Sequence, residues 1–392
     1  MILTNDQEKA LKIILTKYKN REKYVTICGY AGVGKSTLVK FAVEALGVDK
    51  NKIAYATFCG KAAEVLRKKG NPNAMTLHRL LYDSIPKKGG GFFRKPKTSL
   101  EYDIVVVDEI SLAPKSMLEM LLKHNVFCIF IGDNFQLPQI DKSEIHTFLD
   151  NPDIFLSTIM RQAAESEIIQ LTMKIREGKD LGYFQGKEVQ ILPYSQLNTG
   201  MLLWADQILT ATNAKRHSIN QQVRQLLGFQ GELCEKEKIV VKRNYWDDCN
   251  ADGDALVNGT VGIIKNIYDC FIVIPNFIKT PNHTIYTLNG DIVPEVGSSF
   301  DNISIDKNFL LEETPCVDWK VSYQLGKIKY KIGDILPKQI TYGYALTCHA
   351  AQGSEWNNVL VLEESFPFDK IEHARWLYTA CTRASEKLVL LR

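Results

Sequence analysis

The first half of the chain alternates short apolar runs with segments whose apolar residues recur at helical spacing. The runs KYVTICGY, KIAYATF, YDIVVVDE and VFCIFIGD are predicted strands, and STLVKFAVEALG and GKAAEVLRKKG are predicted helices. Strands that are apolar at every position are buried on both faces, which is typical of a parallel sheet covered by helices. The pattern therefore predicts an α/β fold that binds its ligand at the carboxyl ends of the strands.

The second half repeats this pattern with an interruption. A strand, DQILTATN, and a helix, AKRHSINQQVRQLLG, begin a second α/β pattern near residue 186, and ITYGYALTCHA, NVLVLEES and KLVLLR continue it at the end of the chain. Between them the runs are short and β-like, separated by Asn, Gly, Pro and Asp, which indicates a small all-β module. We therefore predict two α/β domains, residues 1–185 and residues 186–237 plus 337–392, with a β module at 238–336.

The helix–strand alternation of the first domain breaks at residues 84–99. The stretch SIPKKGGGFFRKPKTS contains three consecutive glycines and two adjacent aromatic residues, Phe92 and Phe93, and predicts a hairpin or a protruding loop. It lies in a basic region, residues 61–97, that holds ten Lys and Arg against two acidic residues, although the whole chain has a net charge of only +3. Such a region is either a solvated face or a track for phosphates.

Composition narrows the class of protein. At 45% hydrophobic and 24% charged residues the chain is ordinary for a globular protein, and no apolar run approaches the roughly 20 residues that span a bilayer. Its nine cysteines lack metal-clip spacing, which predicts reduced thiols rather than a zinc site. The N-terminus reads as an amphipathic helix and not as a signal peptide. We therefore expect a cytoplasmic protein with no membrane partner.

The stretch GYAGVGKST, residues 29–37, carries the clearest chemistry. It satisfies the pattern G-x-x-x-x-G-K-[ST] between a predicted strand and a predicted helix, so backbone N–H groups are expected to meet phosphate oxygens at the start of the helix. Lys35 is expected to reach the β- and γ-phosphates, and the Ser36 hydroxyl to hold Mg²⁺. The predicted nucleotide contacts are Gly29, Ala31, Gly32, Val33, Gly34, Lys35, Ser36 and Thr37.

An acidic pair completes this predicted site. Asp108 and Glu109 follow the buried run VVV at the carboxyl end of a predicted strand. Asp108 is expected to hold the magnesium ion, directly or through water, and Glu109 to orient and deprotonate the attacking water. An adjacent Asp-Glu pair suits hydrolysis better than phosphate transfer to a small molecule. The sequence therefore predicts ATP and Mg²⁺ as substrate and cofactor.

Further motifs run over nearly the whole chain. They are Leu3–Gln7 (Q motif), Gly60–Ala63 (Ia), Thr76–Leu81, Asp108–Ser111 (II), Gly132–Pro138 (III), Met160–Gln162 (IV), Asn258–Gly262 (the opening of an SH3-like insertion), Thr347–Glu355 (V) and Tyr378–Ala384 (VI). These stretches stand in the order found in superfamily 1 helicases, and the chain resembles their RecD/Dda branch, which moves 5′ to 3′.

The resemblance implies a fold of two RecA-like domains, with a short insertion in the first and an SH3-like insertion in the second. It also implies roles for particular residues. It implies that Gln7 reads adenine, that Gln136 senses the γ-phosphate and that Arg161 contacts it. Glu355, in motif V, is assigned to nucleotide binding. Arg383 is expected to be an arginine finger that reaches the cleft from the second domain. Catalysis is thus assigned to Lys35, Glu109, Gln136, Arg161 and Arg383.

A track for single-stranded DNA follows from the same resemblance. Its expected residues are Lys61, Thr76, His78 and Arg79 in the first domain and Thr347 and His349 in the second. Both histidines also fit a role in the core. Phe92 and Phe93 are placed to split a base pair at a junction of single- and double-stranded DNA, or else to anchor their loop in the core.

Two departures from the family pattern concern the DNA track. Phe58 and Cys59 replace the Pro-Thr of motif Ia, and Ala350 replaces the Lys of motif V. Both changes remove expected phosphate contacts of the DNA backbone and leave the hydrolytic residues intact.

Three functions follow from these residues. The first is an ATP-dependent DNA helicase or translocase moving 5′ to 3′, expected to act as a monomer. The second is a DNA-stimulated ATPase that displaces proteins without processive unwinding. The third is an inactive assembly subunit, which the intact Lys35, Glu109, Gln136 and Arg383 disfavour. Partners in replication or recombination are expected, and the compact domains fit an enzyme of a phage or mobile element.

Overall fold

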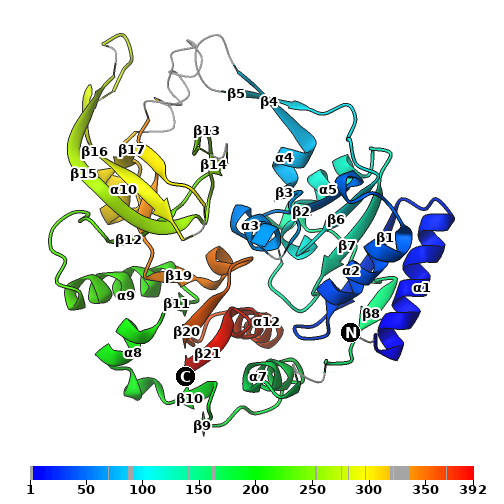
Figure 1. Ribbon diagram of the computed structural model, residues 1–392. Coiled ribbons are helices and arrows are strands. Elements are labelled where there is room, and N and C mark those ends of the chain that lie inside the picture. The colour runs from blue at the N-terminus through cyan, green and yellow to red at the C-terminus, as the bar shows by residue number, and fades with distance from the viewer. Residues whose placement is uncertain are drawn as a thin grey trace. The chain divides into compact units, whose positions relative to one another are not determined.

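The computed structural model describes the chain except for residues 1–2, 69, 87–91, 139–140, 161–163, 252–253, 275, 281, 296, 318–320, 322–335 and 368. The chain forms two compact units (Figure 1). The first comprises Met1–Tyr82, Pro96–Arg216 and Leu346–Arg392, and the second comprises Asp83–Lys95 and His217–Ala345. Among the described residues, no helix has the length and apolarity that crossing a membrane requires.

The first unit contains a six-stranded parallel sheet with the order β3-β2-β6-β7-β1-β8. Its strands are β1 (Tyr24–Gly29), β2 (Ile53–Thr57), β3 (Ala74–Thr76), β6 (Ile104–Val107), β7 (Phe127–Gly132) and β8 (Ile154–Leu156). In the middle of this sheet Val106 pairs with Tyr55 on one side and Ile129 on the other. Because the strands are parallel, the loops after β1, β6 and β7 all leave from the same edge of the sheet.

Helices cover both faces of this sheet, which explains its fully apolar strands. Helices α1 (Asn5–Lys19) and α2 (Lys35–Leu46) pack on the face that Ile104 and Val106 present. The short α4 (Leu77–Leu81) and α5 (Lys115–Leu121) pack on the opposite face with Val105 and Val107. Successive residues of β6 therefore serve two different cores.

A second six-stranded sheet lies in the same unit, with the order β19-β11-β20-β21-β10-β9. Its strands are β9 (Phe184–Gln185), β10 (Val189–Leu192), β11 (Gln207–Thr210), β19 (Ala345–Thr347), β20 (Trp356–Leu362) and β21 (Ala384–Leu391). The central pairs are parallel and β9 is antiparallel to β10. The remaining helices of the α/β part are α3 (Gly60–Lys68), α7 (Glu167–Arg176), α8 (Thr199–Trp204), α9 (Asn213–Leu226) and α12 (Lys370–Cys381). The predicted α/β fold is confirmed.

Short 3₁₀ helices occupy several of the connecting loops. They are η1 (Lys50–Lys52), η2 (Ile110–Leu112), η3 (Lys142–Glu144), η4 (Tyr194–Gln196) and η5 (Cys348–Ala351).

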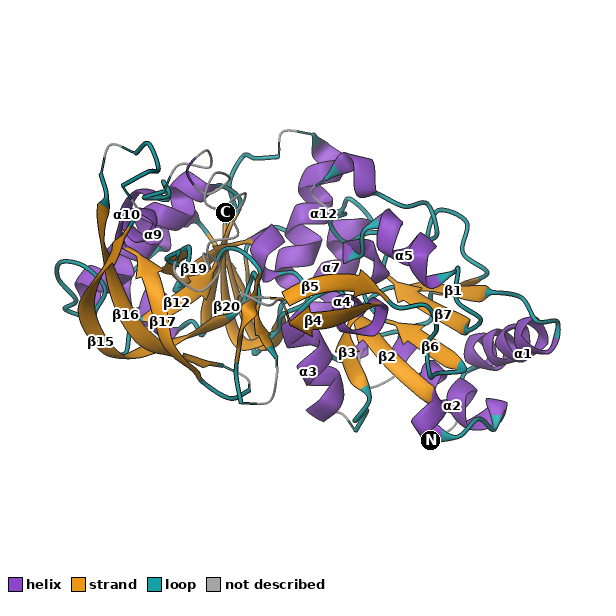
Figure 2. Cartoon of the chain, turned by 90° about the horizontal axis from the view of Figure 1, so that it is seen from above, coloured by secondary structure: helices purple, strands orange, loops and turns teal. Residues whose placement is uncertain are grey.

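The second unit is mostly antiparallel (Figure 2). Its main sheet, in the order β17-β16-β15-β12-β18, is built from β12 (Lys238–Val241), β15 (Val261–Val273), β16 (Thr284–Pro294), β17 (Phe300–Asp306) and β18 (Ile340–Tyr342). A short pair, β13 (Tyr245–Cys249) and β14 (Ala255–Leu256), and the helix α10 (Lys307–Glu312) accompany it. Ile239, Ile264 and Ile305 are fully buried in its core.

The predicted insertion at residues 84–99 contains a second pair of strands. β4 (Tyr82–Pro86) and β5 (Phe92–Pro96) form a two-stranded sheet on either side of the glycines. Residues 87–91 and the side chains of Phe92 and Phe93 lie outside the described part, so both expected roles of the two rings, splitting a base pair or anchoring the loop, stay predictions.

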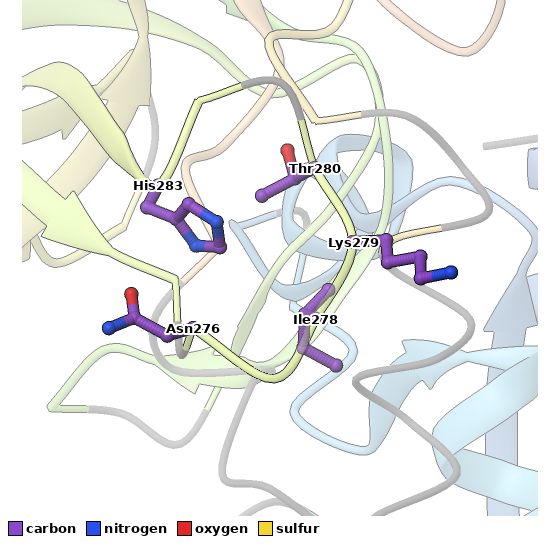
Figure 3. A pocket seen from close by; sticks show the side chains of 5 residues that line it. All are labelled: Asn276, Ile278, Lys279, Thr280 and His283. Atoms are coloured by element: carbon purple, nitrogen blue, oxygen red, sulfur yellow. The ribbon is translucent and has the colours of Figure 1, made fainter.

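The far end of the β15–β16 ribbon has its own small core and an open pocket. Asn276, Ile278, Lys279, Thr280 and His283 line the pocket (Figure 3). Ile274, Ile278 and Ile285 are buried together beside it. On the ribbon itself Phe271 pairs with Tyr286, and these two side chains are 60% and 70% exposed.

Candidate active site

The loop between β1 and α2 has the backbone of a phosphate cradle. Gly32 and Gly34 both have left-handed φ angles, 79° and 77°, which favour glycine. A Cβ on Gly34 would lie 2.6 Å from Nε2 of Gln7, so a larger residue would have to displace that side chain and also adopt the strained positive φ. Helix α2 starts directly after Gly34 without a side-chain cap. Its first N–H groups therefore remain available to an anion.

Lys35 lies over its own loop in this structure. Its ammonium group donates hydrogen bonds to the carbonyls of Gly29 (2.7 Å) and Tyr30 (2.9 Å). Ser36 is exposed at the start of α2, and Val33 is buried in the core against which the loop rests. Lys35 is thus held beside the place where phosphates would bind.

Gln7 is tied to this loop from α1. The side chain is 1% exposed and completes a capping box with Thr4 at the start of the helix. Its Nε2 donates to the carbonyls of Val33 (3.3 Å) and Gly34 (3.4 Å). Gln7 therefore positions the cradle, and its predicted contact with adenine stays a prediction.

Asp108 and Glu109 follow β6 at the same edge of the sheet. The Asp108 N–H donates to the carbonyl of Ala56, and its side chain accepts the Glu109 N–H at 2.9 Å. Glu109 has φ 53° and ψ 46°, a left-handed conformation that non-glycine residues rarely adopt. Such conformations persist only where surrounding structure enforces them, and they cluster at functional sites.

The carboxyl group of Glu109 lies in a low-dielectric place. The residue is half-buried, but its Oε2 is fully buried and has no hydrogen-bond partner among the described atoms. Burial raises the pKa of Glu109, while the positive charges of Arg383 and Lys35 oppose that shift. Since burial dominates, this carboxyl group is more basic than an ordinary glutamate, as a general base should be.

The loop after β7, which carries the predicted motif III, is bonded to Thr379 of α12 and to Gln352, which follows η5. The Leu137 N–H donates to Thr379 Oγ1 (2.9 Å), and the Leu137 carbonyl accepts from Gln352 Nε2 (2.7 Å). Within the loop Asp133 is buried and accepts the Phe135 N–H. Sequence reasoning gave no role to Thr379, Gln352 or Asp133, because their partners are remote in the chain.

Arg383 lies just after α12 and is only 5% exposed. Its guanidinium donates to the carbonyls of Thr379 (3.1 Å) and Ser354 (3.2 Å). The positive charge of Arg383 acts to lower the pKa of Glu109, so the predicted arginine finger lies within electrostatic range of the predicted general base. The neighbouring Glu355 is exposed. Arg161 lies outside the described residues, so its predicted role stays untested.

Three buried polar atoms on the loops after β6 and β7 lack partners among the described atoms. They are Oε2 of Glu109, Oγ of Ser111 and Oε1 of Gln136. Because buried polar atoms in native proteins are nearly always hydrogen-bonded, such orphans indicate the place of a ligand or water. Ser111 carried no role in the sequence analysis beyond its place in motif II.

The residues present fit a magnesium ion held together with phosphates. Ser36 and Asp108 supply one hydroxyl and one carboxylate, and Mg²⁺ in nucleotide sites is commonly held by one or two carboxylates with waters and phosphate oxygens. In the described part of the chain no group of three or more His, Cys, Asp or Glu forms a self-sufficient metal site.

The predicted DNA-track residues of the first domain lie around α3 and α4. The Lys61 ammonium lies 4.2 Å from the ring centroid of Trp356. The Thr76 hydroxyl caps α4 by accepting the Arg79 N–H, while the Arg79 side chain is exposed. His78 has ring contacts with Tyr82 and with Phe58, a residue that departs from motif Ia. The substitution at residue 58 thus adds an aromatic neighbour to His78.

Thr347 and His349 of the second domain flank the start of η5. Thr347 is half-buried and makes no capping bond with its side chain. Burial lowers the pKa of His349, so its ring is neutral at neutral pH. A neutral ring is suited to stacking or hydrogen bonding rather than to an ion pair with phosphate.

The fold and the site define the class of RecA-like P-loop nucleoside triphosphatases. The defining features are two mainly parallel sheets, a P-loop, an acidic pair after β6 and an arginine, just before β21 of the second sheet, whose charge acts on Glu109. A family model described as an AAA domain matches residues 2–190, and one described as a UvrD-like helicase C-terminal domain matches residues 342–391. Together they make up more than half of the 392 residues.

Two curated relatives support the same placement. The chain is 28% identical over 189 residues to the ATP-dependent DNA helicase dda of Enterobacteria phage T4, covering 45% of this chain and 43% of the relative. It is 25% identical over 377 residues to the ATP-dependent RecD2 DNA helicase of Deinococcus radiodurans, covering 93% and 46%. The chain thus spans about half the length of the curated relatives it matches.

Solved structures show the likeness of the fold. A structure of two coordinating Pif1 helicases at forked DNA has a TM-score of 0.53 at 18% identity, with 100% of this chain and 92% of that chain covered. The Bacteroides Pif1 helicase in complex with ADP-AlF3 and single-stranded DNA has a TM-score of 0.51 at 17% identity, with the same coverage. The chain is similar to superfamily 1 helicases of the RecD- and Dda-like branch. The resemblance inferred from the motifs is confirmed.

Proposed function

We propose that the protein is an ATP-dependent DNA helicase or translocase that moves 5′ to 3′ on single-stranded DNA. The observation that carries this proposal is the buried Glu109 carboxyl group beside the P-loop, with Arg383 of the second sheet close enough to affect its pKa. The names of the two curated relatives support DNA as the substrate and ATP as the fuel.

The proposed reaction is hydrolysis of the γ-phosphate. Glu109 takes a proton from a water whose oxygen bonds to the γ-phosphorus, while the bond from that phosphorus to the bridging oxygen breaks and ADP leaves. Lys35, Gln136, Arg161 and Arg383 hold the phosphate oxygens, and an arginine finger can contribute about 10³- to 10⁵-fold to the rate. Mg²⁺, held by Ser36 and Asp108, would neutralise phosphate charge.

Movement follows from the division of this site between two sheets. Arg383 can act only when its sheet approaches the P-loop, so hydrolysis and sheet movement are coupled. We propose that residues 1–185 form one RecA-like domain with an insertion at 84–99. Residues 186–237 and 337–392 form the other, and 238–336 form an SH3-like module. Single-stranded DNA would be gripped alternately by the two domains.

The proposed DNA path uses side chains of both domains, and the enzyme would act as a monomer at junctions of single- and double-stranded DNA. The path residues are Lys61, Thr76, His78, Arg79, Thr347 and His349. Phe92 and Phe93 would separate the strands at the junction. A soluble enzyme in the cytoplasm, with partners in replication or recombination and of phage or mobile-element origin, completes the proposal.

Strand separation on tailed duplexes tests the proposal. We expect the full chain with ATP and Mg²⁺ to unwind a duplex with a 5′ single-stranded tail and not one with a 3′ tail. Lys35→Ala should abolish unwinding because it removes the ammonium group that reaches the phosphates. The measurement is the release of a labelled strand on a native gel.

The other outcomes separate the alternatives. Unwinding of only the 3′-tailed duplex would contradict the direction. ATP hydrolysis that DNA stimulates without unwinding would favour an enzyme that displaces proteins from DNA. A Lys35→Ala variant with wild-type activity would contradict the role of the P-loop.

A further inference from the structure

We propose that Tyr378 is a positioning residue that couples the phosphate-binding loop to the arginine finger, a role that rests on the proposed ATP hydrolysis. Tyr378 lies on α12, and its side chain is fully buried. Its hydroxyl oxygen accepts the backbone N–H of Ala31 in the P-loop at 3.1 Å. The same hydroxyl donates to a carboxylate oxygen of Asp133, 245 residues away in the chain.

This hydroxyl is held as a neutral donor. Burial and the negative charge of Asp133 both raise the pKa of Tyr378 far above its ordinary value. The tyrosine therefore keeps its proton at every physiological pH, and the Asp133 carboxylate keeps its donor. The ring adds a T-shaped contact with Phe135, at 5.3 Å between ring centroids. A hydrogen bond to a buried charged group contributes more than one between neutral groups.

The next residue connects this anchor to the finger. Thr379 accepts the Leu137 N–H with its hydroxyl, and its carbonyl accepts from Nε of Arg383. Tyr378 and Thr379 thus fix the last turns of α12 to the P-loop and to the loop after β7. Arg383 follows α12 directly and is bonded to its last turn through Thr379. A shift of Ala31 or Asp133 would therefore move the backbone that positions the Arg383 side chain.

The Tyr378 hydroxyl on α12 bonds to both nucleotide loops of the first sheet, to the P-loop at Ala31 and to the loop after β7 at Asp133. Phosphates that bind the P-loop act on the backbone around Ala31, while Gln136 lies in the loop that Asp133 begins. The hydroxyl thus transmits a change in the position of either loop to α12 and so to Arg383. Losing it should impair the transition state and leave nucleotide binding intact.

The test is Tyr378→Phe, which keeps the ring and removes both hydrogen bonds. We expect kcat of DNA-stimulated ATP hydrolysis by the full chain to fall about 10- to 100-fold, while KM and the affinity for a fluorescent ATP analogue stay unchanged. The matched control is Tyr245→Phe, since the Tyr245 hydroxyl accepts the Gln339 N–H in the second unit and lies outside the proposed ATP site. The control should keep the wild-type kcat.

A second variant tests whether Tyr378 acts through Arg383. In an Arg383→Ala background, Tyr378→Phe should cause little further loss, because residues that act as one unit give non-additive effects. Losses that multiply would overturn the coupling. A wild-type kcat for Tyr378→Phe, or a rise in KM that explains the whole loss, would overturn the positioning role.

The proposal can still be tested if Tyr378→Phe does not fold. Thermal unfolding is measured first, and Asp133→Asn replaces Tyr378→Phe if the latter is unfolded, because it keeps the side chain's size and removes the charge that accepts the hydroxyl. It should lower kcat about tenfold by the same reasoning, and a wild-type kcat would overturn the proposal. If the wild-type chain itself shows no DNA-stimulated hydrolysis, the proposed function fails before the role of Tyr378 is addressed.

Discussion

At the scale of single residues, Glu109 combines three unfavourable features. Its backbone is left-handed, one carboxylate oxygen is buried without a partner among the described atoms, and burial raises its pKa. Each feature costs free energy in the absence of a ligand. Proteins accept such local costs where a side chain must react, so stability and activity should oppose each other at this position.

The pH dependence of stability follows from the sign of this shift. Below the ordinary value of 4.5 the carboxyl group is protonated in both the folded and the unfolded chain, so it adds no penalty. As pH rises, Glu109 loses its proton first in the unfolded chain. The free energy of unfolding then falls with rising pH until the pH exceeds the raised pKa of the folded state. Glu109→Gln should therefore raise the free energy of unfolding by about 1 kcal/mol at neutral pH and by little near pH 4.

Chemical denaturation of the ligand-free chain at several pH values measures this difference. Glu386→Gln, which changes an exposed carboxylate on β21, is the control and should show no such pH-dependent gain. If Glu109→Gln raised the free energy of unfolding equally near pH 4 and at neutral pH, the titration of Glu109 would not be the cause of the gain. Glu109→Gln should also abolish ATP hydrolysis.

At the scale of elements, a buried ion pair connects α9 to the antiparallel sheet. Arg224 lies near the end of α9 and bonds both carboxylate oxygens of Glu237, at 2.6 and 3.0 Å. The same guanidinium donates to the carbonyls of Gly231 and Glu232 and lies 4.1 Å from the ring centroid of Tyr342. Both charged side chains are at most 5% exposed. The loop between the helix and β12 thus closes around one guanidinium group.

Removing one charge of this pair should destabilise the second unit. Glu237→Gln leaves the Arg224 guanidinium buried without its counter-charge, and such losses cost about 3–5 kcal/mol. We expect a lower midpoint in thermal unfolding. The control is Glu119→Gln. Glu119 forms an exposed ion pair with Lys115 at 3.8 Å, and the loss of this pair should cost less than about 1 kcal/mol. Equal effects of the two variants would contradict the argument.

At the scale of the whole molecule, the strands that flank the Gly-rich stretch belong to the second unit. β4 and β5 group with the β module, although they interrupt the first α/β sheet in sequence. The residues of the proposed ATP site all lie in the first unit. Strand separation and ATP hydrolysis should therefore be separable by mutation.

Alanine at both Phe92 and Phe93 tests this separation. We expect DNA-stimulated ATP hydrolysis to stay near the wild-type rate, because the ATP site is untouched, and unwinding of the 5′-tailed duplex to be lost. The matched control is Phe271→Ala, an exposed aromatic residue on β15. An unchanged unwinding rate of the double variant would mean that the two rings anchor the loop instead of separating strands.

Local patterns predicted much of the first unit. The run at β6 is apolar because the strand is buried on both faces, and the carboxyl end of such a strand marks where polar loop residues meet a ligand. The P-loop glycines were predictable because left-handed backbone has few residue choices. The left-handed conformation of Glu109 left no local signal, since it is imposed by its neighbours.

What the sequence alone determined is therefore the class of fold, the P-loop, the acidic pair and the family, since each depends on residues close together in the chain or on their order. The tertiary structure decided which distant groups meet. Tyr378 reaches Ala31 and Asp133, Gln352 holds Leu137, and Arg383 comes near Glu109. These contacts join loops of two sheets more than 200 residues apart, as the separation of 215 residues between Gln352 and Leu137 illustrates. Hydrogen bonds and charges depend on distance in space, which periodicity along a chain does not encode.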